Sequence, residues 1–409
     1  MGNLNRVYFV LVAIFVLAVF YLSSGVRTPP LKVSGNGERQ AIWAEIEPDR
    51  PLDKDWLPKY KKVRPIQEPL ANFVADPFPL GKDHIDDGQG AKSKNVGFNE
   101  DVFDFQKDLP LRQPQWDLER FMRYRPHHWA GRGKPTYATY FCSRNSSVHD
   151  PYFLAAQQLV YRVLWDPRSK SRRYPFTVFV APFISNEQRE LFAAAGAIVR
   201  QIDLVPWNPT VKTWGRWRDL FSKLNMWGQT DFSRITFLDG DAFPIQNIDQ
   251  IFDLAPHSRC KKELLDKEDL PHADEMCDYT FTGSEVGSYK EINVGVMVFS
   301  PNKHMQARLL RKSQRTDEFD NNMAEQAFLN HAFALGGPFP MHFIGHEWNG
   351  FFPQPDQEHV LKIVHEKIWA FGDMIPWTKN MFSDTHEKML QLYESPEFNK
   401  MRMRDGLRQ

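Results

Sequence analysis

The chain has 409 residues, with 51 basic and 51 acidic side chains, so its formal net charge is zero. That balance argues against a general nucleic-acid binder, which would carry a clear excess of positive charge. Aromatic residues make up 14 % of the chain, enough for a substantial core and for aromatic-lined pockets. The length alone permits more than one domain, and the first third of the chain differs in composition from the rest.

An unbroken apolar run occupies residues 7–22. Together with residues 23–26 it would reach about 30 Å as a helix, at roughly 1.5 Å per residue, which just spans a thin bilayer. Arg6 precedes the run, so the positive-inside rule places residues 1–6 in the cytosol and the chain after about Arg27 in the lumen. We therefore predict a signal-anchor over residues 7–26 of a single-pass type II membrane protein. A cleaved signal peptide is the alternative, because Ser23, Ser24 and Gly25 are small.

Residues 27–132 have the composition of a lumenal stem. Prolines recur between Pro29 and Pro79 among many charged residues, and such a composition disfavours a packed core. Short apolar patches, such as the one around Phe103 and Phe105, are expected to dock onto the folded part of the chain.

From residue 133 the pattern alternates between strand and helix. Strands are predicted over residues 137–141, 176–181 and 197–202, and a helix is predicted over residues 220–229. Asp150 is a predicted N-cap before Pro151, and Ser185 with Gln188 forms a predicted capping box for a helix that ends at Gly196. This alternation predicts an α/β domain with a mainly parallel sheet covered by helices, over residues 133–380.

The second half of that domain is less regular. We expect a short helix over residues 247–252, a polar, irregular segment over 256–285, an apolar strand over 292–299 and a helix over 322–333. A C-terminal helical tail is expected over residues 381–409.

The three cysteines are Cys142, Cys260 and Cys277. Cys260 and Cys277 bracket a short charged insertion, so they are the better candidates for a disulfide in an oxidising lumen. Their spacing fits no metal-binding or redox pattern. Asn145 begins an Asn-Ser-Ser glycosylation acceptor, and a glycan there would lie beside the first strand.

The most informative segment is Arg234–Asp241, in which an apolar run ends in two carboxylates separated by one glycine. Such a run is typical of a strand buried on both faces, and ligands tend to bind at the carboxyl end of such a strand. Asp239 and Asp241 could face one hard cation, while Gly240 leaves room for a diphosphate to approach the backbone. The alternative is an ordinary acidic turn, because short motifs also occur by chance.

An ordered set of motifs resembles the family 8 glycosyltransferases, the glycogenin-like group. The set covers roughly residues 136–372 and comprises YATYF, AAGAIVRQID, the segment with the two aspartates, NIDQIFDL, NVGVMVFSP and EQAFLN. The resemblance implies a single GT-A domain, which is a Rossmann-like nucleotide-sugar-binding fold that uses a divalent metal. It also implies transfer of a hexosyl group from a UDP-sugar with retention of anomeric configuration.

The metal site carries over from the resemblance. Asp239 and Asp241 match the family's DxD pair, which would hold Mn²⁺ or Mg²⁺. For the third ligand, the family's His-Phe-x-Gly-x-x-Lys-Pro-Trp motif is split here between the segments at His342 and His365. We favour His365, because its position after Trp348-Asn349-Gly350 fits better, and Lys367 would then contact the diphosphate.

The resemblance also assigns catalytic and donor-binding roles. Lys223 matches the basic residue of the family's TKL-like helix, and Glu325-Gln326 matches a pair that is more often Asp-Gln. The remaining matches are Arg216 near the donor, Asn293 and Gly295 beside the sugar, and Tyr137 and Thr139 beside the uracil. The alternatives are a solvated helix face for Lys223 and Arg216, a buried strand for Asn293 and Gly295, and a core position for Tyr137.

These inferences predict a membrane-anchored Golgi glycosyltransferase with a lumenal catalytic domain, a UDP-sugar donor, a glycan or glycoconjugate acceptor and no nucleic-acid partner. A non-catalytic nucleotide-sugar-binding or scaffolding protein is the alternative, because Glu325 and the short His365–Lys367 spacing depart from the family pattern. An anchored metal-dependent phosphohydrolase is less favoured, because it would need more clustering of His and Asp. The donor sugar stays open, because glucose, galactose, N-acetylglucosamine and glucuronate all fit. The acceptor stays open too, because acceptor loops vary freely on a shared scaffold.

Overall fold

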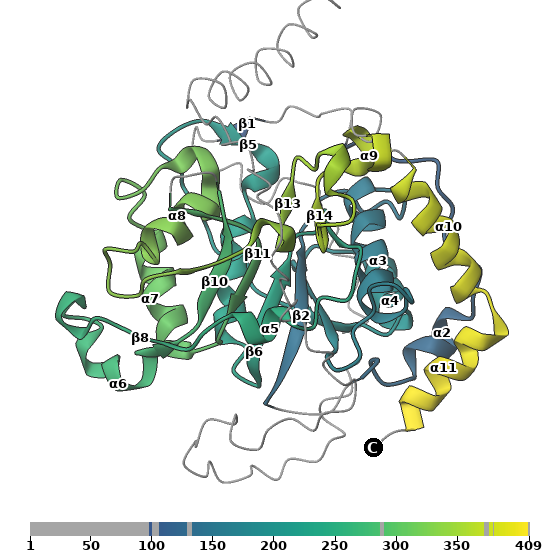
Figure 1. Cartoon of the computed structure of the whole chain (residues 1–409), viewed down its shortest axis with the longest axis horizontal. Helices are drawn as coiled ribbons and strands as arrows, with labels where there is room; N and C mark the ends of the chain where they lie inside the picture. Colours follow the sequence, from purple (N-terminus) through teal and green to yellow (C-terminus); the bar gives the residue numbers. More distant parts are fainter. Residues whose placement is uncertain are drawn as a thin grey trace, which may run out of the picture. The chain divides into compact units, whose positions relative to one another are not determined.

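The structure is a computed structural model that describes residues 98–99, 106–128, 133–286, 290–371, 376–378 and 380–407 (Figure 1). The predicted cytosolic tail, signal-anchor and most of the predicted stem lie outside these residues. Within the described ranges, no helix has the length and apolarity that a membrane crossing requires.

A mixed sheet of seven strands forms the centre of the domain. The strands follow the order β12 (His342–Ile344), β10 (Phe281–Glu285), β11 (Ile292–Phe299), β6 (Phe232–Leu238), β2 (Lys134–Phe141), β3 (Phe176–Val180) and β4 (Ile198–Gln201). Only β11 runs against its neighbours β6 and β10, whereas the other pairs in this sheet are parallel. The mainly parallel α/β sheet predicted from the sequence is therefore confirmed.

Strand β10 corrects the prediction of an irregular segment over residues 256–285. Its sequence, Phe281-Thr282-Gly283-Ser284-Glu285, has a single large apolar residue and thus no clear strand pattern. Pairing with β11 on one side and β12 on the other creates the strand, and neither contact can be read from the local sequence. The same region also contains β8 (Ser258–Arg259), η6 (Lys262–Leu264), η7 (Leu270–His272), α6 (Ala273–Met276) and β9 (Asp278–Tyr279).

The helices that flank the first strands begin where their caps predict. Asp150 accepts a hydrogen bond from the Phe153 amide at 3.1 Å and starts α3 (Pro151–Leu164). Ser185 caps α4 (Asn186–Ala194), which ends before Gly196 at φ +100°. Gln188, however, does not complete the predicted capping box: its Nε2 donates to the carbonyls of Asn145 and Ser147, both at 3.1 Å. These two bonds tie α4 to the loop that follows β2.

Other predicted helices are shorter or differ in type. The 220–229 segment is a 3₁₀ helix, η5 (Leu220–Gly228), and the 247–252 helix appears only as α5 (Ile251–Leu254). The 322–333 helix divides into η8 (Asn321–Met323) and α8 (Ala324–Ala332), with Ala324 at φ 47° between them. The remaining elements are β1 (Phe98–Asn99), α2 (Leu118–Met122), β5 (Thr213–Trp214), η4 (Gly215–Trp217), β7 (Ala242–Pro244), α7 (Lys303–Ser313), η9 (His346–Trp348), β13 (Gly350–Phe351), η10 (Pro355–Gln357), β14 (Ile363–His365), α9 (Ile368–Phe371), η12 (Pro376–Thr378), α10 (Met381–Tyr393) and α11 (Pro396–Leu407).

Helices cover the sheet, and the two ends of the described chain pack together. Helix α3 lies against β2 and β3, α8 lies against β11, and α10 packs outside α3 (Figure 1). Trp116 stacks on Tyr393, and Phe121 contacts Phe398. The fully buried Arg402 donates to the carbonyls of Ala194 at 3.1 Å and Arg125 at 2.7 Å. Residues 106–128, assigned to the stem, and the tail after residue 381 are thus packed into the folded domain.

The predicted disulfide joins Cys260 to Cys277, with their Cα atoms 4.7 Å apart, and Cys142 is a free cysteine. In the loop after β2, the Asn145 amide donates to Asp108 at 2.7 Å, and the Ser147 hydroxyl donates to the same carboxylate at 2.6 Å. Glycosylation of Asn145 stays a prediction.

Candidate active site

Two strand ends bring the predicted metal ligands together. Strand β6 ends at Leu238, and the Asp239 amide donates to the Gly295 carbonyl on β11 at 2.7 Å. The chain then turns, with the Ala242 amide donating to the Asp239 carbonyl at 2.9 Å, and continues as β7. Strand β14 pairs with β7 so that His365 lies opposite Ala242, the residue after Asp241.

Asp239, Asp241 and His365 each offer a ligand atom, and these atoms lie within 4.8 Å of one another. His365 Nε2 lies 3.3 Å from Asp241 Oδ1. His365 Nδ1 lies 2.8 Å from Asn349 Oδ1, and a hydrogen bond of this kind fixes the ring and leaves Nε2 as the ligand atom. His342 is elsewhere, with its Nε2 at 2.6 Å from the Ser258 hydroxyl, so the geometry favours His365 as the sequence did.

Gly295 forms a cradle for this group of side chains. A Cβ at this position would lie 2.1 Å from His365 Cε1 and 2.9 Å from both Asn293 Oδ1 and Asp239 Oδ2. Any side chain would therefore push apart the atoms that converge here. Carboxylate oxygens with a neutral imidazole suit Mn²⁺, so the residues present fit a divalent cation.

Two lysines neutralise the two aspartates. Lys367 Nζ lies 2.7 Å from Asp241 Oδ2, and Lys223 Nζ lies 2.8 Å from Asp239 Oδ1 and from Glu325 Oε1. Burial alone raises the pKa of Asp241, but Lys367 and His365 outweigh it and hold that pKa well below its ordinary value. Asp241 is therefore ionised and can act as an anionic ligand at neutral pH.

Lys223 is buried, so the solvated-helix alternative is wrong for this residue. Its side chain is 2 % exposed, and it lies on η5. Burial by itself lowers the pKa of Lys223, but the charges of Asp239 and Glu325 outweigh it and raise the pKa above its ordinary value. Glu325 is equally enclosed, and burial raises its pKa despite the attraction of Lys223. Lys223 therefore contacts Asp239 directly, and Glu325 contacts Lys223.

The other residues assigned to the sugar lie at the same end of β11. Asn293 Oδ1 accepts from the Gly295 amide at 2.9 Å and from Asn349 Nδ2 at 3.2 Å. Gln326 Oε1 accepts from the Val294 amide at 3.4 Å.

Arg216, assigned near the donor, lies over the rings of Trp214 and Trp217. Burial lowers the pKa of Arg216, while nearby charges, including Asp241, counteract that effect.

Tyr137 and Thr139 do not join this group. Both are fully buried on β2, and the Tyr137 hydroxyl donates to Asp249 Oδ1 at 2.9 Å. Neither offers accessible surface to a nucleotide. Tyr137 is therefore a core residue, which was the alternative to uracil binding. The space expected around Gly240 is present, because a Cβ at this position would meet no atom within 4 Å.

Sequence reasoning assigned no role to Asn349 and Phe351, which contact site residues, or to Phe352, whose ring contacts Phe351. Asn349 links His365 to Asn293, and Phe351 lies with its ring 5.3 Å from the His365 ring. Phe351 and Phe352 are 41 % and 51 % exposed, and Phe352 has φ 49°. The sequence signal was present as an aromatic pair directly after Trp348-Asn349-Gly350.

Comparisons with known proteins identify relatives of this chain. No family model matches it. It is 28 % identical over 280 residues to an uncharacterized protein of Schizosaccharomyces pombe, covering 59 % of this chain and 75 % of the relative. It is 30 % identical over 240 residues to galactinol synthase 6 of Arabidopsis thaliana, covering 54 % of this chain and 68 % of that enzyme. It is 31 % identical over 175 residues to galactinol synthase 1 of Solanum lycopersicum, covering 39 % of this chain and 51 % of that enzyme.

Solved structures show weaker likeness. The apo form of the glycosyltransferase GlyE from Streptococcus pneumoniae gives a TM-score of 0.39 at 11 % identity, covering 66 % of this chain and 64 % of GlyE. Mouse xyloside xylosyltransferase 1 gives a TM-score of 0.36 at 13 % identity, covering 57 % of this chain and 97 % of the mouse enzyme. The assignment therefore depends on the sequence relatives: the chain belongs to the family 8 glycosyltransferases and is a glycosyltransferase enzyme.

Proposed function

We propose that this enzyme transfers a hexosyl group from a UDP-sugar to a glycan or glycoconjugate of the secretory pathway, with retention of configuration. The observation that carries the proposal is the convergence of Asp239, Asp241 and His365 at the rim of the sheet, beside the open backbone of Gly240. These three side chains would hold Mn²⁺ or Mg²⁺. When bound, such an ion supplies positive charge to the phosphates of the departing UDP.

The remaining positive charge comes from the chain itself. Lys367, with its side chain 24 % exposed, places its ammonium group 2.7 Å from Asp241 Oδ2, where it would face the phosphates of a bound UDP-sugar. Arg216 contributes a second cation near Asp241. Preorganised cations of this kind act where negative charge develops in the transition state, which is usually the largest electrostatic contribution to catalysis.

Two departures from the family pattern had suggested a non-catalytic protein. The longer side chain of Glu325 forms an ion pair with Lys223 at 2.8 Å, and the short His365–Lys367 spacing places both residues against Asp241. Neither departure removes a functional group from the site. Together with the relationship to galactinol synthases, this favours turnover over simple binding.

We further propose a type II Golgi protein anchored by residues 7–26, with the catalytic domain in the lumen. The disulfide between Cys260 and Cys277 supports this location, because disulfides persist in oxidising compartments and are rare in the cytosol.

A screen of UDP release by the full-length protein in detergent tests the proposal. UDP-galactose comes first, because the relatives are named for galactinol, followed by the UDP derivatives of glucose, N-acetylglucosamine and glucuronate. We expect one donor to be consumed with Mn²⁺ and not with EDTA, and the Asp239→Asn and Asp241→Asn variants to be inactive while folded. Full turnover by the Asp241→Asn variant, or undiminished turnover in EDTA, would overturn the metal assignment.

A further inference from the structure

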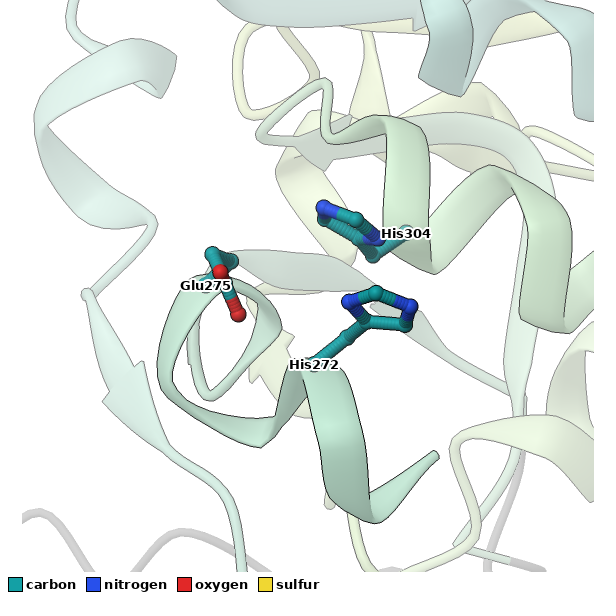
Figure 2. Close-up of side chains that lie close together, drawn as sticks. All are labelled: His272, Glu275 and His304. Carbon is teal, nitrogen blue, oxygen red and sulfur yellow. The ribbon is translucent and has the colours of Figure 1, made fainter. Parts of the chain in front are cut away.

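We propose that His272, Glu275 and His304 form a second divalent-cation site, of the zinc class, outside the active site. His272 ends η7, Glu275 lies on α6 and His304 lies in the first turn of α7 (Figure 2). One ligand atom from each lies within 4.8 Å of the other two. Figure 2 shows the Glu275 carboxylate across from both imidazole rings, with the three side chains enclosing a common space.

The two imidazole rings stack on each other, so one ring must turn before a nitrogen of each can face the same ion. Their ring centroids are 4.0 Å apart and the ring planes differ by 20°. His272 and Glu275 are three residues apart on one turn, so they share a face. Two imidazoles from different elements and one carboxylate thus meet at one point on the surface.

Contacts beneath the cluster fix the backbones that carry it. The Asn302 side chain caps α7 by accepting from the His304 amide at 2.9 Å, and it donates to the Glu275 carbonyl at 2.8 Å. One asparagine therefore holds the backbones of two of the three ligands. Asp269, three residues before His272, is 2 % exposed and bonds Arg308 of α7 at 2.9 Å. The disulfide at Cys277 holds the other end of α6.

This ligand set differs in chemistry from the active site. Two histidines and one glutamate are a common zinc set, which leaves the fourth tetrahedral position for water or another ligand. The active-site group has two carboxylates and one imidazole, which suits Mn²⁺ or Mg²⁺ better. Metals that favour nitrogen ligands should therefore prefer the second cluster.

A cation bound by His272, Glu275 and His304 would join two separate segments of the chain. The insertion between Cys260 and Cys277 would be connected to α7 by a metal bridge in addition to Asn302 and Asp269. A ligand that binds only the folded state stabilises it by RT ln(1 + L/Kd), where L is the free ligand concentration. We therefore expect Zn²⁺ to stabilise the domain without taking part in transfer.

The test uses Zn²⁺ as the probe with the full-length protein in the Asp241→Asn background, where the active-site ligands are impaired. Isothermal titration with Zn²⁺ is compared before and after adding His304→Ala. We expect the added substitution to weaken one binding event by about tenfold or more and to abolish the rise in Tm caused by Zn²⁺. His359→Ala removes an exposed histidine outside the cluster and should change neither result.

Glu275→Gln provides a second variant that keeps the shape of the side chain and leaves the Asn302 contacts intact, in case His304→Ala misfolds. In an otherwise wild-type chain, His304→Ala should release UDP with Mn²⁺ at the normal rate. Equal Zn²⁺ affinity and stoichiometry in the parent, His304→Ala and Glu275→Gln proteins would overturn the proposal. Because the readout is binding, failure of the proposed transferase activity would not affect it.

Discussion

Gly295→Ala is the sharpest test of the active-site geometry, because the added methyl would lie 2.1 Å from His365 Cε1. An ordinary carbon contact needs about 3.5–4.0 Å, so the ring must retreat by roughly an ångström or more. The His365 ring is buried and bonded to Asn349 at 2.8 Å, so this retreat strains or breaks that hydrogen bond. Overpacking of this kind costs about 1–3 kcal/mol, and losing the hydrogen-bond partner of a metal-binding histidine weakens metal affinity by about 10–100-fold.

The assay pairs Mn²⁺ titration with thermal unfolding, using Gly240→Ala as the matched control. The control adds the same methyl between the two aspartates, where nothing lies within 4 Å. We expect Gly295→Ala to lower Tm by several degrees and to weaken Mn²⁺ binding by at least about tenfold. Gly240→Ala should leave Tm and Mn²⁺ affinity unchanged. Gly240→Ala should instead weaken UDP binding, if the diphosphate approaches this backbone. Wild-type Mn²⁺ affinity in Gly295→Ala would refute the arrangement of ligands around Gly295.

Three further predictions concern stability. Lys223→Met removes the ion-pair partner of buried Glu325, which must then stay charged without a counter-ion or take up a proton. We expect a loss of about 3–5 kcal/mol in urea unfolding at neutral pH, largely restored by adding Glu325→Gln; a stable single variant would contradict the buried pair. Burial raises the pKa of Asp150 to about 7, so folding takes up a proton and stability falls as pH rises from about 4 to 7. Asp150→Asn, still a capping residue, should flatten that slope, and an unchanged pH dependence of unfolding would count against it. Replacing Cys260 and Cys277 by serine should cost about 3 kcal/mol for the short loop they close, and an unchanged unfolding midpoint would show that the bond contributes nothing.

The parts of the fold predicted correctly are those encoded over short stretches of chain. Strand β11 occupies the residues expected from its apolar run, and α3 begins at the Asp150 cap. The β6 strand and its two aspartates likewise follow from one octet. In each case neighbouring residues determine the structure, through caps, turns or continuous apolar character.

The parts that sequence reasoning missed depend on contacts between distant segments. Strand β10 exists because β11 and β12 lie on its two sides. Tyr137 has the residue type expected beside a uracil, but its hydroxyl meets Asp249, more than a hundred positions away. The preference for His365 over His342 could be stated from motif order, but only the pairing of β14 with β7 brings the imidazole to Asp241.

The two lysines show why motif matching alone cannot assign roles within such a site. Lys223 and Lys367 both matched basic positions of the family pattern, and each now bonds one of the aspartates. Lys223 is 2 % exposed and shared with Glu325, so moving it toward a ligand would leave a buried carboxylate without its counter-ion, which is strongly unfavourable. Lys367 is 24 % exposed, and its partner Asp241 also contacts His365. Burial therefore separates Lys223, enclosed between Asp239 and Glu325, from the partly exposed Lys367, a difference that two equivalent letters in a sequence do not contain.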